Sequence, residues 1–134
     1  MSDTKIVVAT HAARRIPPDQ VVALYAEAKW WPERTSPQVA GALEFGPAVG
    51  AWSGDRLVGF ARAVSDGHFR AYVEDVVVAE EMRGSGIGGR LMKAVMGQLH
   101  DIPTVSLFCG ADLVDYYKDR GFAATDQTVM HHRA

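Results

Sequence analysis

A run of glycines between a valine-rich segment and an amphipathic segment constrains the fold more than any other feature of the sequence. Arg83 to Gly89 reads R-G-S-G-I-G-G, and we call it the glycine loop. The preceding segment, Tyr72–Val78, is rich in β-branched residues and predicts a strand. The following segment, Arg90–His100, has leucine and valine at spacings of four and predicts a helix with one apolar face. The chain must therefore contain a strand, a tight loop and a helix in succession.

The glycine loop is suited to bind a phosphate or pyrophosphate. A helix N-terminus offers free N–H groups and the positive end of a dipole, and glycine lets a ligand approach the backbone. A glycine-rich loop without a ligand is the alternative. No Walker A string occurs. Gly84–Gly89 matches the dinucleotide pattern GxGxxG, but five residues separate Val78 from Gly84, whereas that pattern follows its strand directly. A nicotinamide dinucleotide is therefore disfavoured.

The other segments predict a mixed α/β domain. Ser53–Arg56 and Asp66–His68 are typical of turns between antiparallel strands, and one helical crossover should follow. Besides the strand and helix around the glycine loop, we expect strands at Lys5–Ala9, Ala48–Trp52, Leu57–Val64, Thr104–Phe108 and Thr128–His132. We expect further helices at about Pro18–Lys29, from Ser36 to about Gly46, and at Ala111–Asp119.

Length and composition indicate a single domain over residues 1–134, because no repeat or linker-like run occurs. A net charge of −2 argues against a strongly basic nucleic-acid binder. No apolar stretch is long enough to span a membrane, and no signal-peptide pattern is evident. The single cysteine, Cys109, fits the reducing cytoplasm. His131 and His132 lack companion ligands, so no metal site is expected.

Three motifs in a fixed order resemble the GNAT N-acetyltransferase superfamily. Arg83–Gly88 matches its acetyl-CoA pyrophosphate loop, Arg/Gln-x-x-Gly-x-Gly/Ala. Tyr117–Phe122 resembles its Tyr-x-x-x-Gly-Phe element, and Leu57–Phe60 resembles its hydrophobic-Val-Gly strand. The resemblance covers about Val49 to Phe122. It implies a mixed, mostly antiparallel sheet with a splayed strand pair and flanking helices, and transfer of an acetyl group from acetyl-CoA to an amine.

The resemblance also implies where acetyl-CoA binds. Its pantetheine would lie between the strand before the glycine loop and the strand Thr104–Phe108, and a backbone N–H of Val76 or Val77 would support the thioester carbonyl. The side chain of Arg83 either adds a charge contact or points to solvent. The expected cofactor-binding residues are Val76, Val77, Val78, Arg83, Gly84, Ser85, Gly86, Ile87, Gly88 and Gly89.

Tyr117 is the expected proton donor, because it matches the family's tyrosine that protonates the leaving CoA sulfur. Acyl transfer needs such a proton, together with a neutral amine and a stabilised thioester oxygen. The alternative is that Tyr117 only packs its ring into the core. Tyr116 provides an internal comparison, because neighbouring helix positions face about 100° apart.

Glu74 is the expected base or amine-orienting group, directly or through a water. Val73–Val78 is similar to the Ile-Glu-Asp strand of glucosamine-phosphate acetyltransferases. Strand alternation predicts that Glu74 and Asp75 face opposite sides, so Asp75 is a second candidate for the base. Both carboxylates could instead form ion pairs with Arg62 or Arg70.

The acceptor is expected to be the primary amine of a small molecule, acetylated by direct transfer in a ternary complex. Two alternatives stay open: a catalytically silent CoA-binding regulatory module, and a protein N-acetyltransferase. Trp30 and Trp31 could stack on a substrate or belong to the core. Gly110 stands where many relatives have asparagine. Only twelve residues follow Phe122, so the acceptor site has short walls or is completed by a second subunit in a homodimer.

Overall fold

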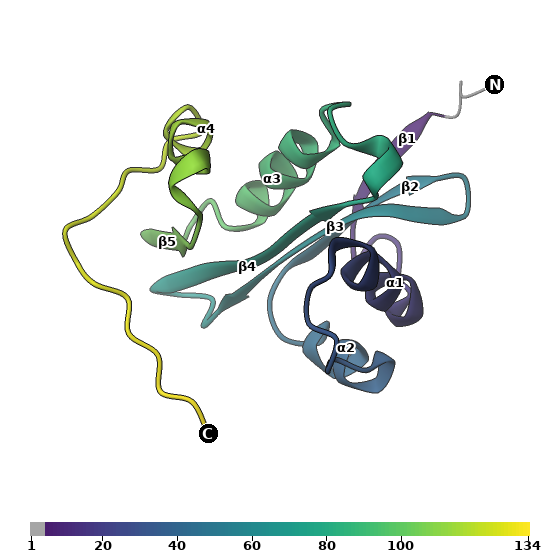
Figure 1. The fold of residues 1–134 in the computed structure, drawn as a ribbon, viewed down its shortest axis with the longest axis horizontal. Helices are drawn as coiled ribbons and strands as arrows, with labels where there is room; N and C mark the ends of the chain where they lie inside the picture. Colours follow the sequence, from purple (N-terminus) through teal and green to yellow (C-terminus); the bar gives the residue numbers. More distant parts are fainter. Residues whose placement is uncertain (1–4) are drawn as a thin grey trace.

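The computed structural model describes residues 5–134 and is built on one five-stranded sheet (Figure 1). The strands lie in the order in which they occur in the chain, and all neighbours are antiparallel except β4 and β5. Their bounds are β1 Ile6–Thr10, β2 Ala48–Ser53, β3 Arg56–Ser65, β4 Arg70–Val78 and β5 Thr104–Leu107. The mixed, mostly antiparallel sheet expected from the sequence is confirmed.

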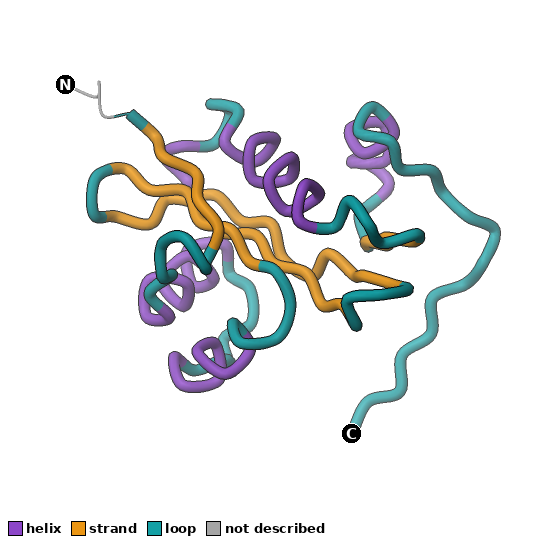
Figure 2. The backbone as a smooth tube through the Cα atoms, turned by 180° about the vertical axis from the view of Figure 1, so that it is seen from behind, coloured by secondary structure: helices purple, strands orange, loops and turns teal. Residues whose placement is uncertain are grey.

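Helices cover both faces of the sheet. Helices α1 (Pro18–Ala28) and α2 (Ser36–Ala42) lie on one face, and α3 (Ile87–Gln98) lies on the other (Figures 1 and 2). The short helix α4 (Val114–Lys118) lies beside β5. Two 3-10 turns, Glu80–Met82 and Ala111–Leu113, precede α3 and α4. Within the described residues, no helix is long and apolar enough to cross a membrane.

The core explains one of the sequence motifs. Leu91 and Val95 of α3 are completely buried against the sheet. A Cβ atom added to Gly59 would lie 2.9 Å from Cδ1 of Leu91, closer than real Cβ atoms approach. The glycine of the hydrophobic-Val-Gly strand is therefore required by the close packing of α3 on β3.

Strand β5 pairs with only part of β4. The register ends at Val73 opposite Leu107, whereas β4 continues to Val78. The β4 residues from Asp75 to Val78 pair with β3 on one side, and within residues 5–134 no strand pairs with them on the other side. The splayed strand pair is thus present, and it leaves backbone groups of β4 open next to the glycine loop.

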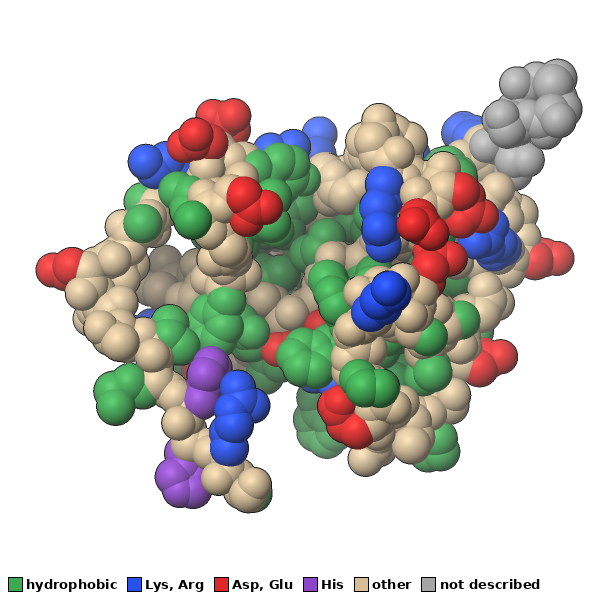
Figure 3. Space-filling model, in the orientation of Figure 1, with side chains coloured by type: hydrophobic (Ala, Val, Ile, Leu, Met, Phe, Trp, Pro, Cys, Tyr) green, Lys and Arg blue, Asp and Glu red, His purple; other side chains and the backbone are tan. Residues whose placement is uncertain are grey.

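The C-terminal segment differs from the sequence prediction. A strand at Thr128–His132 is wrong, because residues 123–134 form an extended segment without a strand partner. Val129 and Met130 are 55% and 87% exposed, and Figure 3 shows this segment as an arm beside the body of the domain. A strand needs a neighbouring edge for its backbone hydrogen bonds, whereas this arm touches the domain through side chains, with the ring of His131 5.7 Å from that of Phe108.

Candidate active site

A β-bulge in β4 places two neighbouring carboxylates on one site. Arg62 of β3 is opposite Asp75, but the next residue, Ala63, is opposite Val73, so Glu74 is the extra residue. A bulge redirects side chains that strict alternation would separate. The expectation that Glu74 and Asp75 serve opposite faces is wrong: both carboxylates contact the guanidinium groups of Arg34 and Arg62.

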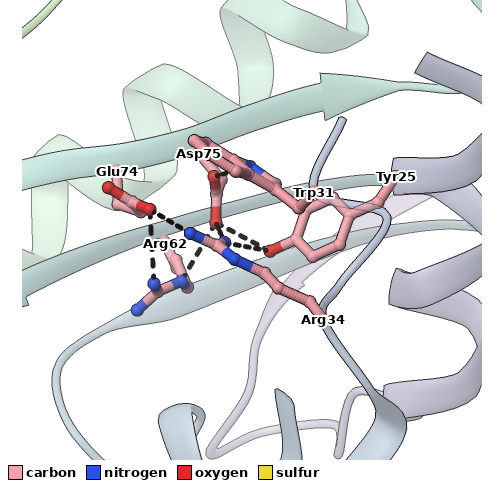
Figure 4. A network of polar contacts seen from close by, with 6 residues as sticks. All are labelled: Tyr25, Trp31, Arg34, Arg62, Glu74 and Asp75. Atoms are coloured by element: carbon pink, nitrogen blue, oxygen red, sulfur yellow. Dashed lines mark hydrogen bonds and ion pairs between the residues drawn. The ribbon is translucent and has the colours of Figure 1, made fainter. Parts of the chain in front are cut away.

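These carboxylates belong to a six-residue network drawn from four separate parts of the chain (Figure 4). Asp75 accepts hydrogen bonds from the Tyr25 hydroxyl at 2.7 Å and from Nε of Arg62 at 3.0 Å. Arg34 donates from Nη2 to Glu74 at 2.7 Å and from Nη1 to Asp75 at 3.4 Å. The indole N–H of Trp31 donates to Asp75 at 3.3 Å. The six residues are Tyr25, Trp31, Arg34, Arg62, Glu74 and Asp75.

The network contains a buried charge that must be compensated by its neighbours. Asp75 is only 2% exposed, and a buried charge is tolerated only when it is paired and hydrogen-bonded. Burial, followed by the charge of Asp75, raises the pKa of Tyr25 above its ordinary range. Burial and the charge of Glu74 raise the pKa of Tyr72 to about 12. Both phenols are therefore neutral hydrogen-bond donors at neutral pH.

A pocket of about 430 Å³ opens beside the network. Arg34 stands at its wall, with its guanidinium 4.1 Å from the ring centroid of Trp31 and 5.6 Å from that of Tyr25. Trp31 has a φ of 50°, in the left-handed region that residues other than glycine rarely adopt. The lining residues are Tyr25, Trp31, Glu33, Arg34, Gln38, Val39, Ala42 and Arg62. The pocket thus combines aromatic, aliphatic and charged groups.

The glycine loop lies at the far end of β4 and presents its backbone. Gly84 and Gly86 have φ values of 81° and 87°, which glycine adopts without steric cost. The first backbone hydrogen bond of α3 runs from Arg90 N–H to the carbonyl of Gly86. The N–H groups of the three residues between them, Ile87 to Gly89, therefore point out of the first turn without a helical acceptor. This arrangement suits a phosphate group.

The other predicted cofactor-binding residues lie directly before the loop. Val77 is buried, and Val76 and Val78 are half-buried. The side chain of Arg83 is exposed and folds back, so that Nε donates to the carbonyl of Val78 at 3.2 Å. Its guanidinium therefore stands at the junction of β4 and the glycine loop.

Tyr117 lies apart from the six-residue network. It is half-buried on α4, and its ring packs edge-on against Tyr116 at 5.0 Å and Phe122 at 5.9 Å. Burial raises the pKa of its phenol. No hydrogen bond joins Tyr117 to Glu74 among residues 5–134. The neighbouring Tyr116 stacks under the guanidinium of Arg120 at 3.5 Å.

Sequence reasoning missed Tyr25 and Arg34. The predicted ion pairing with Arg62 is confirmed, but Arg70 does not take part, and Arg34 from the loop after α1 takes its place. The signal available in the sequence was indirect: an aspartate within a valine-rich strand requires buried counter-charges. Nothing in the spacing of the chain indicated that residues 25 and 34 would provide them.

Comparison with known proteins identifies the family. Residues 11–122 match the profile of the Acetyltransferase (GNAT) family, and since this is most of the chain, the protein belongs to that family. A GNAT-family acetyltransferase of Streptococcus pneumoniae has the same fold, with a TM-score of 0.81, 27% identity and coverage of 97% of this chain and 98% of that one.

Two curated relatives match about three quarters of the chain. A histone acetyltransferase of Glycine max is 30% identical over 113 residues, and serotonin N-acetyltransferase 2, chloroplastic, of Oryza sativa is 31% identical over 106 residues. Each match covers 74% of this chain, and 49% and 53% of the respective relative. The chain therefore spans about half the length of these two relatives.

Proposed function

We propose that the protein transfers the acetyl group of acetyl-CoA to the primary amine of a small molecule, within one ternary complex. The observation that carries this proposal is that β4 serves two different surfaces. Its last residues offer open backbone groups beside the glycine loop, and its bulge holds two carboxylates beside a pocket. A thioester on the first surface and an amine on the second would meet along one strand.

The acetyl-CoA surface fits its ligand in chemical terms. The open edge of β4 at Val76, Val77 and Val78 provides backbone partners for the amide groups of pantetheine. The glycine loop, from Arg83 through Gly84, Ser85, Gly86, Ile87 and Gly88 to Gly89, provides N–H groups and the positive end of α3 for the pyrophosphate.

The reaction divides its proton transfers between two groups. The amine nitrogen forms a bond to the thioester carbon, and the carbon–sulfur bond then breaks. Glu74, directly or through a water, takes the proton that the amine loses, and Tyr117 gives a proton to the departing thiolate. A backbone N–H of Val76 or Val77 would support the negative charge that develops on the carbonyl oxygen.

A small acceptor is favoured by the size and lining of the pocket. A volume of about 430 Å³ with two aromatic rings suits a compact amine. A protein acceptor is the second candidate, because one relative is named a histone acetyltransferase. A protein acceptor would have to insert a lysine side chain into the same pocket, so activity on a lysine peptide and none on free amines would favour it.

We propose that the protein is a cytoplasmic homodimer. Among residues 5–134, strand β5 is an edge strand with one unpaired side, and the C-terminal arm carries two exposed apolar residues, Val129 and Met130. Exposed edges of this kind are usually covered, and a second copy would cover the edge and the arm by the same symmetric contact. Light scattering tests the dimer, and a monomeric mass at micromolar concentration would contradict it.

The activity is tested by measuring thiol release from acetyl-CoA with a panel of amines that includes a lysine peptide. We expect release with at least one small amine, and a loss of turnover of about 10²-fold in Tyr117→Phe, the scale of general acid catalysis. Tyr116→Phe removes the same hydroxyl one position earlier and serves as the control. Binding of acetyl-CoA without thiol release for any amine would instead support the silent module.

A further inference from the structure

The guanidinium of Arg34 occupies a site built for a cation. It is held by Glu74 at 2.7 Å and Asp75 at 3.4 Å, and it lies over the rings of Trp31 and Tyr25. Two carboxylates and two aromatic faces around one position are the groups that bind a positively charged ligand. Arg34 fills this position from within the chain.

Arg34 and Arg62 differ in how firmly they are held. Arg62 belongs to β3, lies opposite Asp75 in the sheet register and has a side chain only 14% exposed. Arg34 belongs to the loop between α1 and α2 and has a side chain 25% exposed, although both arginines line the pocket. Arg34 is therefore the less buried of the two and is anchored outside the sheet, so its side chain can leave its partners more readily than that of Arg62.

The charges of the network are already balanced. Glu74 and Asp75 face two guanidinium groups, so an ammonium ion entering with both arginines in place would be a third cation beside two carboxylates. In this arrangement Glu74 is also ion-paired with both guanidinium groups, so its carboxylate is not free to contact the amine. Binding of a charged acceptor and release of Glu74 thus require the same movement.

We infer that Arg34 is an internal stand-in for the acceptor's ammonium group, which the acceptor displaces when it binds. This inference rests on the proposed function for the assignment of the pocket to the acceptor. It makes Arg34 a specificity-determining residue: only an acceptor that arrives as a cation replaces the charge that Arg34 withdraws. A neutral molecule of the same shape leaves Arg34 in place.

The test uses the full chain without acetyl-CoA, with 2-phenylethylammonium as the probe and neutral 2-phenylethanol as its isostere. Calorimetry should show that Arg34→Ala binds the ammonium about tenfold more tightly than the unaltered protein, because no internal cation has to be displaced. The alcohol should bind both proteins equally. Arg34→Lys keeps a cation in the network and should bind the ammonium no more tightly than the unaltered protein.

Two further variants serve as a replacement and as a control. Arg34→Gln keeps a hydrogen-bond donor toward Glu74 without the charge, so it replaces Arg34→Ala if that variant does not fold, with the same expected gain. Arg15→Ala removes an arginine paired with a carboxylate, Glu44 at 3.4 Å, outside the network, and should not change binding of the probe. The inference would be overturned if the folded Arg34 variant bound the ammonium no more tightly than the unaltered protein. It would also be overturned if the affinity for the alcohol rose as much as the affinity for the ammonium.

The binding result is independent of catalysis. A gain in ammonium affinity in the Arg34 variant, without thiol release for any amine, would sustain the displacement of Arg34 and reject the proposed function. Thiol release with an Arg34 variant whose KM for the amine does not fall would sustain the proposed function and reject the displacement.

Discussion

The two surfaces that meet on β4 are built in opposite ways. The proposed CoA surface uses backbone groups of residues that are close in sequence, from Val76 to Gly89. The six-residue network uses side chains from positions as far apart as Tyr25 and Asp75, 50 residues along the chain. A backbone surface depends on local conformation and tolerates most side chains. A buried charge network depends on its side chains, because the loss of one removes a partner from the others.

The largest effect is expected at the centre of the network. Asp75→Ala removes the carboxylate shared by Tyr25, Trp31 and both arginines, and breaking a buried ion pair in this way costs about 3–5 kcal/mol of folding free energy. Urea unfolding measures this loss. Asp101→Ala removes an aspartate paired with His100 on the surface and should change stability by less than about 1 kcal/mol. Similar losses in the two variants would refute the central role of Asp75.

A substitution that changes the backbone conformation of the glycine loop should reduce CoA affinity strongly and stability only slightly. Gly86 has a φ of 87° and open space around its Cβ position, so Gly86→Ala changes backbone preference without a clash. Displacing the N–H groups of the glycine loop should weaken CoA binding about 10²-fold, with a smaller effect on stability than that of Asp75→Ala. Calorimetry with CoA measures the affinity.

Gly97→Ala is the matched control in the same helix. Gly97 also has open space around its Cβ position but an ordinary helical φ. Its substitution should stabilise the protein by about 0.5–1 kcal/mol and leave CoA affinity unchanged. If both glycine variants bound CoA normally, the conformation of the glycine loop would not matter for the cofactor.

A smaller effect is expected where only one hydrogen bond is lost. Tyr25→Phe keeps the buried ring but removes the hydroxyl that donates to Asp75 at 2.7 Å. Hydrogen bonds to charged groups contribute about 1.5–3 kcal/mol, and Asp75 keeps its other partners, so we expect about 2 kcal/mol at neutral pH. A loss as large as that of Asp75→Ala would show that the aromatic ring, and not the hydroxyl, is what the substitution disturbs.

The same pair of proteins gives a pH test. The pKa of Tyr25 is raised in the folded state, so its stabilising effect is complete below about pH 10, where unfolded tyrosine titrates, and is lost as the pH rises toward the folded value. The stability difference between the unaltered protein and Tyr25→Phe should therefore shrink above pH 10, by up to about 1.4 kcal/mol per pH unit. A constant difference from pH 8 to pH 12 would contradict this.

The structural elements of the proposed CoA surface were more predictable from sequence than the network. The valine-rich strand, the glycine loop and the helix are consecutive, so their order and local propensities predicted β4, the loop and α3 to within a few residues. Gly59 was recognised as part of a motif, although its reason, contact with Leu91, emerged only from the packing of α3.

The network was predictable only in part. The sequence singled out Glu74, Asp75 and Arg62, but a bulge depends on the pairing of two strands, and alternation therefore predicted the wrong geometry. The role of Arg34 depends on how the loop after α1 folds over the sheet, which no spacing in the chain encodes. The predicted strand at Thr128–His132 was wrong for a related reason. Strand propensity is a local property of the sequence, whereas the edge with which a strand pairs is supplied by the whole fold.

Initial-rate kinetics with two substrates test the central claim most directly, that both surfaces of β4 act in one complex. Rates would be measured over a grid of acetyl-CoA concentrations and concentrations of the best acceptor from the amine panel. Direct transfer in a ternary complex predicts double-reciprocal lines that intersect. Parallel lines, the pattern of an acetylated enzyme intermediate, would contradict the account.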